Sequence, residues 1–335
     1  MKKYFVTGGC GFIGSNFIRY ILNIDDSAIV INLDKLTYAG NLKNLSDFKN
    51  DERYLFYHGD ICDSKIVREI FQQHKPDYLI NFAAESHVDR SIGKPADFIQ
   101  TDIFGTFTLL EAAREFGLER FIQISTDEVY GSIEKGSFSE TDALMPRNPY
   151  SASKAGADRL AYSYFTTYGL PVIITRASNN YGPYQFPEKL IPLFVTNALE
   201  EKKLPVYGDG KNIRDWLYVE DHCDAIQYII NNGEVGEIFN IGGGNELTNI
   251  EITDIILRET NRPESLKKFV QDRLGHDRRY SLDCEKLSNI GWQPKHEFQE
   301  AMEFTVDWYK KNDEWWEPLK SGEYLEYYKE HYKEI

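Results

Sequence analysis

The residues best suited to acid–base chemistry are Tyr150 and Lys154, in the string YSASK that follows Pro149. Side chains four residues apart lie one turn apart on one face of a helix. A lysine ammonium at that spacing favours phenolate over phenol through its positive charge. A phenol whose pKa is normally about 10 could then act as a base near neutral pH. Surface ion pairs share this spacing, so a solvated helix face is the alternative.

Ser125 and Thr126 lie 25 and 24 residues before Tyr150, at the end of a predicted parallel strand. Ligands bind at the carboxyl ends of such strands. The sequence therefore predicts that Thr126, Tyr150 and Lys154 face one ligand.

Three glycines, Gly8, Gly11 and Gly14, follow the first predicted strand in the string TGGCGFIG. Gly8 permits a tight turn, Gly11 lets the backbone approach a pyrophosphate, and Gly14 lets the next helix pack closely. The N-terminus of that helix then faces the phosphates. Asp34, at the end of the second predicted strand, can accept hydrogen bonds from a ribose and would repel a 2′-phosphate. The pattern predicts an NAD site rather than an NADP site, and residues of ordinary surface turns are the alternative.

The elements that position these residues are short apolar runs that alternate with helical patterns. The predicted strands are 4–7, 29–33, 54–58, 78–82, 121–125 and 172–176, and the predicted helices are 12–22, 64–74, 98–116 and 150–168. This alternation implies parallel strands joined by right-handed crossovers. We therefore expect an α/β fold with a doubly wound, Rossmann-like parallel sheet covered on both faces.

Beyond residue 176 the pattern changes, which predicts a smaller C-terminal α/β lobe. Segment 179–192 is rich in Asn, Tyr, Gly and Pro, a composition more typical of a pocket wall than of a core. After it we expect a helix to about 203, a turn at 207–211, an apolar run at 215–219, a strand at 237–241 and helices at 221–231 and 250–259. The tail 308–335 is predicted to form an amphipathic helical cap.

Composition limits the classes of partner. The 335 residues include 38 basic and 53 acidic ones, a net charge of −15, which argues against nonspecific binding of nucleic acid or anionic membranes. No stretch approaches the ~20 apolar residues of a membrane span, and no signal peptide is recognisable. The four cysteines lack paired spacing, and the seven histidines lack metal-ligand spacing. We expect a cytoplasmic protein with reduced thiols and no metal.

Longer strings carry a resemblance to a known family. They are AAESHVDRS at 83–91, TDEVYG at 126–131, NNYGPYQ at 179–185 and HDRRY at 276–280. With the glycine loop, Asp34 and the Tyr150–Lys154 pair, they resemble the dTDP-glucose 4,6-dehydratases of the extended short-chain dehydrogenase/reductase superfamily, from residue 1 to about 316. Leu274, where that family has proline, and Cys10, where alanine is usual, depart from the pattern without touching the implied chemistry.

The resemblance implies three coupled steps on dTDP-glucose. Tyr150, helped by Lys154 and Thr126, takes the C4 hydroxyl proton while hydride passes to NAD. Glu128 then removes the C5 proton, which the C4 ketone has made acidic, and Asp127 in its protonated form donates to the leaving C6 hydroxyl. The hydride returns to C6, so the product is dTDP-4-keto-6-deoxyglucose and the cofactor ends as it began.

Asp127 and Glu128 can serve one sugar only if the backbone leaves strand geometry, because successive strand side chains point to opposite faces. They also need different environments, with Asp127 kept protonated by burial or by its neighbour's charge. Two solvated acids at a strand end are the alternative.

The resemblance also implies contacts with the cofactor and the nucleotide sugar, in which Arg214 and Arg279, with Lys189 close by, would meet the pyrophosphate. No catalytic role is given to His87. The expected NAD contacts are Gly8, Gly11, Phe12, Ile13, Gly14, Asp34, Lys35, Thr37, Asp60, Ile61, Ala83, Ala84, Ser86, Thr101, Ser125, Tyr150, Lys154 and Asn180. The expected substrate contacts are Ser86, Thr126, Asn179, Lys189, Leu190, Pro205, Tyr207, Arg214, Asn249, Asp272, His276, Arg279 and Tyr280. We assign 1–178 and about 215–243 to an NAD-binding domain, and about 179–214 and 244–335 to a nucleotide-sugar-binding lobe.

A homodimer is expected, because the superfamily pairs helices 98–116 and 150–168 across a two-fold axis. The small residues that would allow close packing are Gly105, Thr108, Ala112, Ala155, Gly156 and Ala157, and packing within the chain is the alternative. Two other functions stay open. A nucleotide-sugar 4-epimerase shares Thr126, Tyr150 and Lys154 but needs no acid–base pair, and a non-catalytic nucleotide-sugar sensor would use the fold only for binding.

Overall fold

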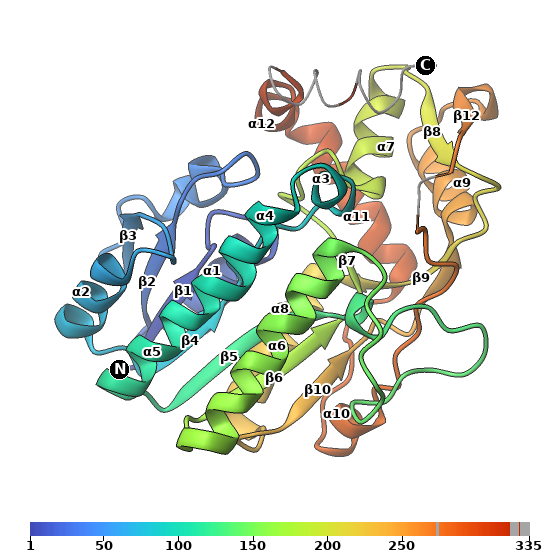
Figure 1. The fold of residues 1–335 in the computed structure, drawn as a ribbon. Coiled ribbons are helices and arrows are strands. Elements are labelled where there is room, and N and C mark those ends of the chain that lie inside the picture. Colours follow the sequence, from blue (N-terminus) through green and yellow to red (C-terminus); the bar gives the residue numbers. More distant parts are fainter. Residues whose placement is uncertain (273–274, 322–327, 329–335) are drawn as a thin grey trace.

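A computed structural model of the chain describes residues 1–272, 275–321 and 328. Its centre is a seven-stranded parallel sheet in the order β10-β6-β5-β4-β1-β2-β3 (Figure 1). The predicted doubly wound sheet is thereby confirmed, and its strand order reverses between β1 and β4, the position at which such sheets bind ligands. The strands are β1 (Lys3–Thr7), β2 (Ile29–Asp34), β3 (Tyr54–His58), β4 (Tyr78–Asn81), β5 (Arg120–Thr126), β6 (Val172–Ala177) and β10 (Ile238–Ile241).

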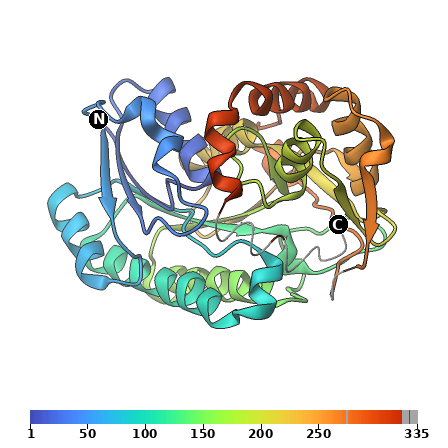
Figure 2. The ribbon, with the colours of Figure 1, turned by 90° about the horizontal axis from the view of Figure 1, so that it is seen from above.

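Helices cover both faces of this sheet, as Figure 2 shows. Val6 and Ile80 pack on one face in a core that includes residues of α1 and α8. Phe5 and Leu79 point to the other face, in a core that includes residues of α2, α5 and α6. Strands that are buried on both faces have continuous apolar sequences, and these runs allowed the strands to be predicted. The helices are α1 (Phe12–Ile24), α2 (Ser64–His74), α5 (Thr106–Phe116), α6 (Pro149–Tyr168) and α8 (Val219–Asn232).

The prediction of one regular helix over 98–116 is wrong in its first part. After α3 (Val88–Gly93), α4 (Pro95–Phe98) runs into a π-helical segment, Ile99–Gly105, and only then into α5. A π turn inserts an extra residue, so the faces on either side of it are offset. Within this segment Asp102 is buried and Thr101 lines a cavity.

The smaller lobe contains two further sheets. One has the order β11-β9-β7, and the other pairs β8 with β12. The predicted turn at 207–211 is confirmed, with Gly208 and Gly210 at φ of +55° and +70°. The predicted helices of this lobe are also present. The elements are β7 (Asn179–Tyr181), α7 (Leu190–Leu199), β8 (Leu204–Tyr207), β9 (Ile213–Tyr218), β11 (Glu246–Thr248), α9 (Asn249–Glu259), β12 (Lys267–Val270), α10 (Glu285–Asn289), α11 (Phe298–Lys311) and α12 (Asp313–Trp316).

The division into two domains stays a prediction. Strand β9, most of which that division places with the NAD-binding domain, pairs with β7 and β11, whereas β10 joins the large sheet. In the tail, Trp308 and Trp315 pack against Tyr184, with ring centroids 4.7 and 5.8 Å away. Leu274 and most of the predicted C-terminal cap beyond residue 321 lie outside the described residues. Among the residues that are described, no helix is long and apolar enough to cross a membrane.

Candidate active site

A cavity of about 420 Å³ lies at the carboxyl ends of the central strands and is also lined by residues of α7 and β8. Its wall includes the glycine loop, Asp34 and the Tyr150–Lys154 segment, which enter from different parts of the chain. The site therefore lies at the switch point of the sheet.

The glycine loop packs too tightly for larger residues. Gly8 has φ of +69°, and a Cβ atom there would lie 2.6 Å from the Ala83 nitrogen. A Cβ atom on Gly14 would lie 2.4 Å from the Gly8 oxygen. Asp34 accepts hydrogen bonds from the backbone nitrogens of Cys10 and Leu36 at 2.8 and 2.7 Å, which fix its carboxylate beside the loop. This is the arrangement by which a dinucleotide pyrophosphate and ribose are held.

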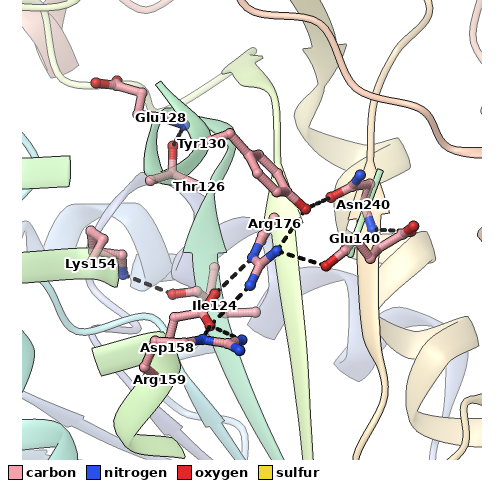
Figure 3. A network of polar contacts seen from close by, with 10 residues as sticks. All are labelled: Ile124, Thr126, Glu128, Tyr130, Glu140, Lys154, Asp158, Arg159, Arg176 and Asn240. Atoms are coloured by element: carbon pink, nitrogen blue, oxygen red, sulfur yellow. Dashed lines mark hydrogen bonds and ion pairs between the residues drawn. The ribbon is translucent and has the colours of Figure 1, made fainter. Parts of the chain in front are cut away.

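Lys154 reaches the cavity from α6, whose first turn is capped by the Asn148 side chain accepting a hydrogen bond from Ser151 N. The Lys154 ammonium donates to the Ile124 carbonyl at 2.7 Å (Figure 3). Burial lowers the pKa of Lys154, and the charges of Asp102 and Asp158 oppose that shift. The two carboxylates thus help to keep this buried lysine protonated.

The phenol of Tyr150 lies in the same cavity, but its pKa is shifted opposite to the expected direction. Burial raises the pKa of Tyr150 well above its usual value, and the negative charges of Glu128 and Asp102 raise it further. A hydrogen bond with the Thr126 side chain acts the other way without reversing the shift. The direction of this shift does not support a phenol near neutrality in the protein alone, because burial and the charges of Glu128 and Asp102 favour the protonated form.

The acid pair follows β5 in the predicted irregular geometry. The strand ends at Thr126, and a 3-10 helix, Asp127–Tyr130, begins at the next residue. The departure from strand geometry is therefore confirmed. The Thr126 hydroxyl accepts from Glu128 N at 3.4 Å and donates to Asp127 Oδ1 at 3.2 Å, which ties the three residues together.

Asp127 and Glu128 occupy different environments, as expected. Asp127 is buried, with 2% of its surface exposed. Burial and the charge of Glu128 raise the pKa of Asp127 well above its usual value, against the opposing charge of Arg214. Burial of this kind favours the protonated carboxyl, which can donate its proton.

One buried acid beside the site, Asp102, was missed by the sequence analysis. Its carboxylate accepts from Ser153 Oγ at 2.5 Å and from Glu85 N at 2.9 Å, which joins α6 to the loop after β4. Burial raises the pKa of Asp102 to about 6, although the charge of Lys154 lowers it. An acidic residue within an otherwise apolar helical pattern was the signal that could have revealed it.

All predicted catalytic and cofactor residues line the cavity, whereas the predicted substrate residues are divided. The substrate residues that line it are Ser86, Thr126, Asn179, Lys189, Leu190, Pro205, Tyr207, Arg214, Asn249 and His276. Asp272, Arg279 and Tyr280 are not among the lining residues. Their predicted contacts with substrate stay predictions.

Each of these three residues has another contact. Arg279 donates to both carboxylate oxygens of Glu246, at 2.7 and 2.8 Å, and to the Gly136 carbonyl at 2.7 Å. The Tyr280 ring lies 4.2 Å from the Arg214 guanidinium carbon, and Asp272 is hydrogen-bonded to the His276 ring at 2.6 Å. Tyr280 and Asp272 therefore support lining residues, while the Arg279 guanidinium is held by Glu246.

Several buried polar atoms on the cavity wall have no hydrogen-bond partner among the described residues. Buried polar groups normally have one, so this wall fits a polar ligand rather than an apolar one. These atoms include Ser125 Oγ, Asp127 Oδ2, Asn179 Oδ1, His222 Nε2 and Asn249 Oδ1.

Comparison with known proteins agrees with this geometry. Residues 5–305 match the family model described as GDP-mannose 4,6 dehydratase. The chain belongs to this dehydratase family. It is 48% identical over 359 residues to dTDP-glucose 4,6-dehydratase 1 of Escherichia coli K12, with 99% of each chain covered. It is 52% identical over 310 residues to the low-salt glycan biosynthesis protein Agl12 of Haloferax volcanii, covering 92% of this chain and 99% of that protein.

Solved structures show the same relationship. The chain is similar to DesIV (dTDP-glucose 4,6-dehydratase) from Streptomyces venezuelae, with a TM-score of 0.92 and 50% identity. The match covers 95% of this chain and 100% of DesIV, which was solved with NAD and TYD bound. The family resemblance predicted from the sequence is confirmed.

Proposed function

We propose that the protein is a dTDP-glucose 4,6-dehydratase that uses NAD as a regenerated cofactor. The observation that carries this proposal is the pairing of a buried Asp127 with Glu128 in the cavity that contains Tyr150 and Lys154. Oxidation and reduction at C4 alone, as in an epimerase, require no second acid–base pair. The relatives named dTDP-glucose 4,6-dehydratase support the same substrate.

The residues present fit NAD. The glycine loop leaves backbone at the N-terminus of α1 for a pyrophosphate, and the carboxylate of Asp34 suits a ribose without a 2′-phosphate. When bound, NAD supplies a hydride acceptor and the positive charge of its nicotinamide ring.

Tyr150 is the base for the C4 hydroxyl. In the protein alone its phenol holds its proton, because burial and the charges of Glu128 and Asp102 oppose phenolate. Lys154, fixed by the Ile124 carbonyl, and the hydrogen bond from Thr126 favour the phenolate once the site is assembled. The C4 ketone that forms makes the C5 proton acidic.

Glu128 and Asp127 then share the removal of water. Glu128 takes the C5 proton as general base, and Asp127 gives its proton to the departing C6 hydroxyl as general acid. Their separate environments assign the roles, since Asp127 is buried and favoured in its neutral form, whereas the Glu128 side chain is half-buried. General acid and base groups of this kind each contribute about 10²- to 10⁴-fold to a rate.

The nucleotide end of the cavity provides local positive charge on an acidic protein. Arg214 is buried, rests on the Tyr280 ring and donates to the Asp277 carbonyl at 2.9 Å. Lys189 lies on the same cavity wall and donates to the Ser86 carbonyl. We assign these two cations to the diphosphate, and the rings of Tyr207 and His276 to the base and sugar of the nucleotide.

We also propose a homodimer, in which the expected helix 98–116 contributes exposed aromatic residues rather than its small ones. The small residues of the two helices pack within the chain, since a Cβ atom on Gly105 would lie 2.3 Å from Ile61 and one on Gly156 would lie 2.8 Å from Ile103. Phe104 and Phe107, by contrast, are 45% and 40% exposed. Exposed aromatic residues beside one another fit the apolar centre of an interface with a second copy. A cytoplasmic location, consistent with four free cysteines, completes the proposal.

The test is incubation of the purified protein and NAD with dTDP-glucose, followed by mass spectrometry, with UDP- and CDP-glucose as controls. A dehydratase gives a 4-keto-6-deoxy product lighter by one water. A C4 isomer of unchanged mass would identify an epimerase, and binding without turnover would identify a sensor.

A further inference from the structure

The proposed chemistry requires two elements to keep a fixed position relative to each other. Tyr150 and Lys154 lie in the first turns of α6, whereas Asp127 and Glu128 lie in the 3-10 helix after β5. One buried side chain, Arg176 of β6, binds both elements (Figure 3).

On the side of α6, Arg176 forms a two-point ion pair with Asp158. Its Nε donates to Asp158 Oδ2 at 2.8 Å, and a terminal nitrogen donates to Asp158 Oδ1 at 3.1 Å. Asp158 follows Lys154 by four residues, one turn along the same helix. A bidentate pair of this kind fixes direction as well as distance.

On the side of the 3-10 helix, the other terminal nitrogen of Arg176 donates to the Tyr130 hydroxyl at 2.7 Å. Tyr130 is the last residue of the 3-10 helix that begins at Asp127. Its ring lies 4.7 Å from the guanidinium carbon and is stacked on Phe138 at 5.0 Å. The same hydroxyl donates to Asn240 Oδ1 at 2.8 Å, so the end of the helix is held at several points.

The sheet register places this network beside the site. Arg176 lies opposite Ser125 in β5 and opposite Asn240 in β10. Arg176 and Asp158 are 1% and 0% exposed. A buried ion pair adds little net stability, because desolvation offsets most of the attraction. A network with satisfied hydrogen bonds does specify one geometry.

We propose that Arg176 is a positioning residue that holds the acid–base pair in register with the Tyr150–Lys154 pair. Arg176 does not line the cavity, so it acts through Asp158 and Tyr130. The inference rests on the proposed function. Displacement of reacting groups by about 1 Å costs up to ~10²-fold in rate, so a loosened 3-10 helix should slow loss of water more than oxidation at C4.

The test is Tyr130→Phe, which removes the hydroxyl and keeps the stacked ring. Tyr20→Phe is the control, since the Tyr20 hydroxyl donates to Asp224 Oδ1 at 2.6 Å between α1 and α8, away from the cavity lining. Oxidation is measured with dTDP-6-deoxyglucose, which can form the C4 ketone but has no C6 hydroxyl to lose. Dehydration is measured with dTDP-glucose, and thermal unfolding is recorded for each protein.

For Tyr130→Phe we expect dehydration to slow about tenfold while oxidation stays within about twofold of the parent. Tyr20→Phe should leave the ratio of the two rates unchanged, whatever it does to stability. Arg176→Lys, which keeps a cation for Asp158 without the forked geometry, should lower the ratio as Tyr130→Phe does.

An unchanged ratio for Tyr130→Phe, or an equal change for Tyr20→Phe, would overturn the positioning role. A parent protein that makes no ketone from dTDP-glucose would instead overturn the proposed function, and this is seen before any variant is made.

Discussion

Replacement of Asp127 by asparagine should lower activity and change stability in a pH-dependent way. Asp127 is 2% exposed, and burial together with the charge of Glu128 raises its pKa well above the usual value. In the unfolded chain an aspartate titrates near ~3.9. The amide has nearly the shape of the protonated acid but cannot release a proton to a leaving hydroxyl.

The sign of the stability effect follows from proton linkage. Between the two pKa values, the folded protein holds a proton that the unfolded chain has lost, so the parent loses stability as pH rises through this range. Each unit by which the folded pKa exceeds the unfolded one removes about 1.4 kcal/mol. Asp127→Asn removes this pH-dependent loss of stability. Its amide oxygen can still accept the hydrogen bond that the Thr126 hydroxyl donates to Asp127 Oδ1 at 3.2 Å in the parent. The free energy of unfolding of the variant, relative to that of the parent, should therefore increase as pH rises.

Two assays distinguish loss of the Asp127 proton from a nonspecific loss of folding or activity in Asp127→Asn. Urea unfolding at about pH 5 and about pH 8 should show a stability difference that moves in favour of Asp127→Asn at the higher pH. Dehydration of dTDP-glucose should fall by about 10²- to 10⁴-fold, while oxidation of dTDP-6-deoxyglucose persists. Parental dehydration, or a stability difference independent of pH, would refute the role given to the Asp127 proton.

Three further predictions concern other parts of the site and surface. Glu128→Gln should bind NAD almost normally and oxidise C4, but lose water at least about 100-fold more slowly, and dehydration at the parental rate would contradict its role as base. Gly14→Ala should weaken NAD binding at least about tenfold, because its Cβ atom would lie 2.4 Å from the Gly8 oxygen. Gly93→Ala, whose Cβ atom would meet nothing within 4 Å, is the control and should bind NAD normally, with both affinities measured by equilibrium dialysis. Phe107→Glu should sediment as a monomer, whereas Phe304→Glu, at another exposed phenylalanine, should sediment as a dimer. A dimeric Phe107→Glu would exclude the proposed interface.

Much of the fold could be predicted because its signals are local. The buried parallel strands read as apolar runs, and β6 at Val172–Ala177 differs from its predicted range by one residue. The π-helical segment Ile99–Gly105 could not be located, because a helical apolar period continues on both sides of the inserted residue. The irregular geometry after Thr126 was predictable only because two adjacent acids had to face the same side.

The site could be predicted where its residues are close in sequence. It could not be predicted where a residue's contacts or pKa depend on partners that are distant in sequence. The glycine loop and Asp34 depend on one βαβ unit. Arg279, by contrast, is held by Glu246, which lies 33 residues away on β11. The pKa of Tyr150 depends on Glu128 and on Asp102 from the π-helical segment, and neither influence is visible in a spacing of four residues.

The measurement that tests the central claim most directly uses dTDP-glucose carrying deuterium at C4. If Tyr150, Glu128 and Asp127 act on one bound sugar as assigned, the hydride taken from C4 returns to C6 without reaching solvent. Nuclear magnetic resonance should then find the deuterium in the C6 methyl group of a 4-keto product. Deuterium retained at C4 of a sugar of unchanged mass, or lost to water, would contradict the account.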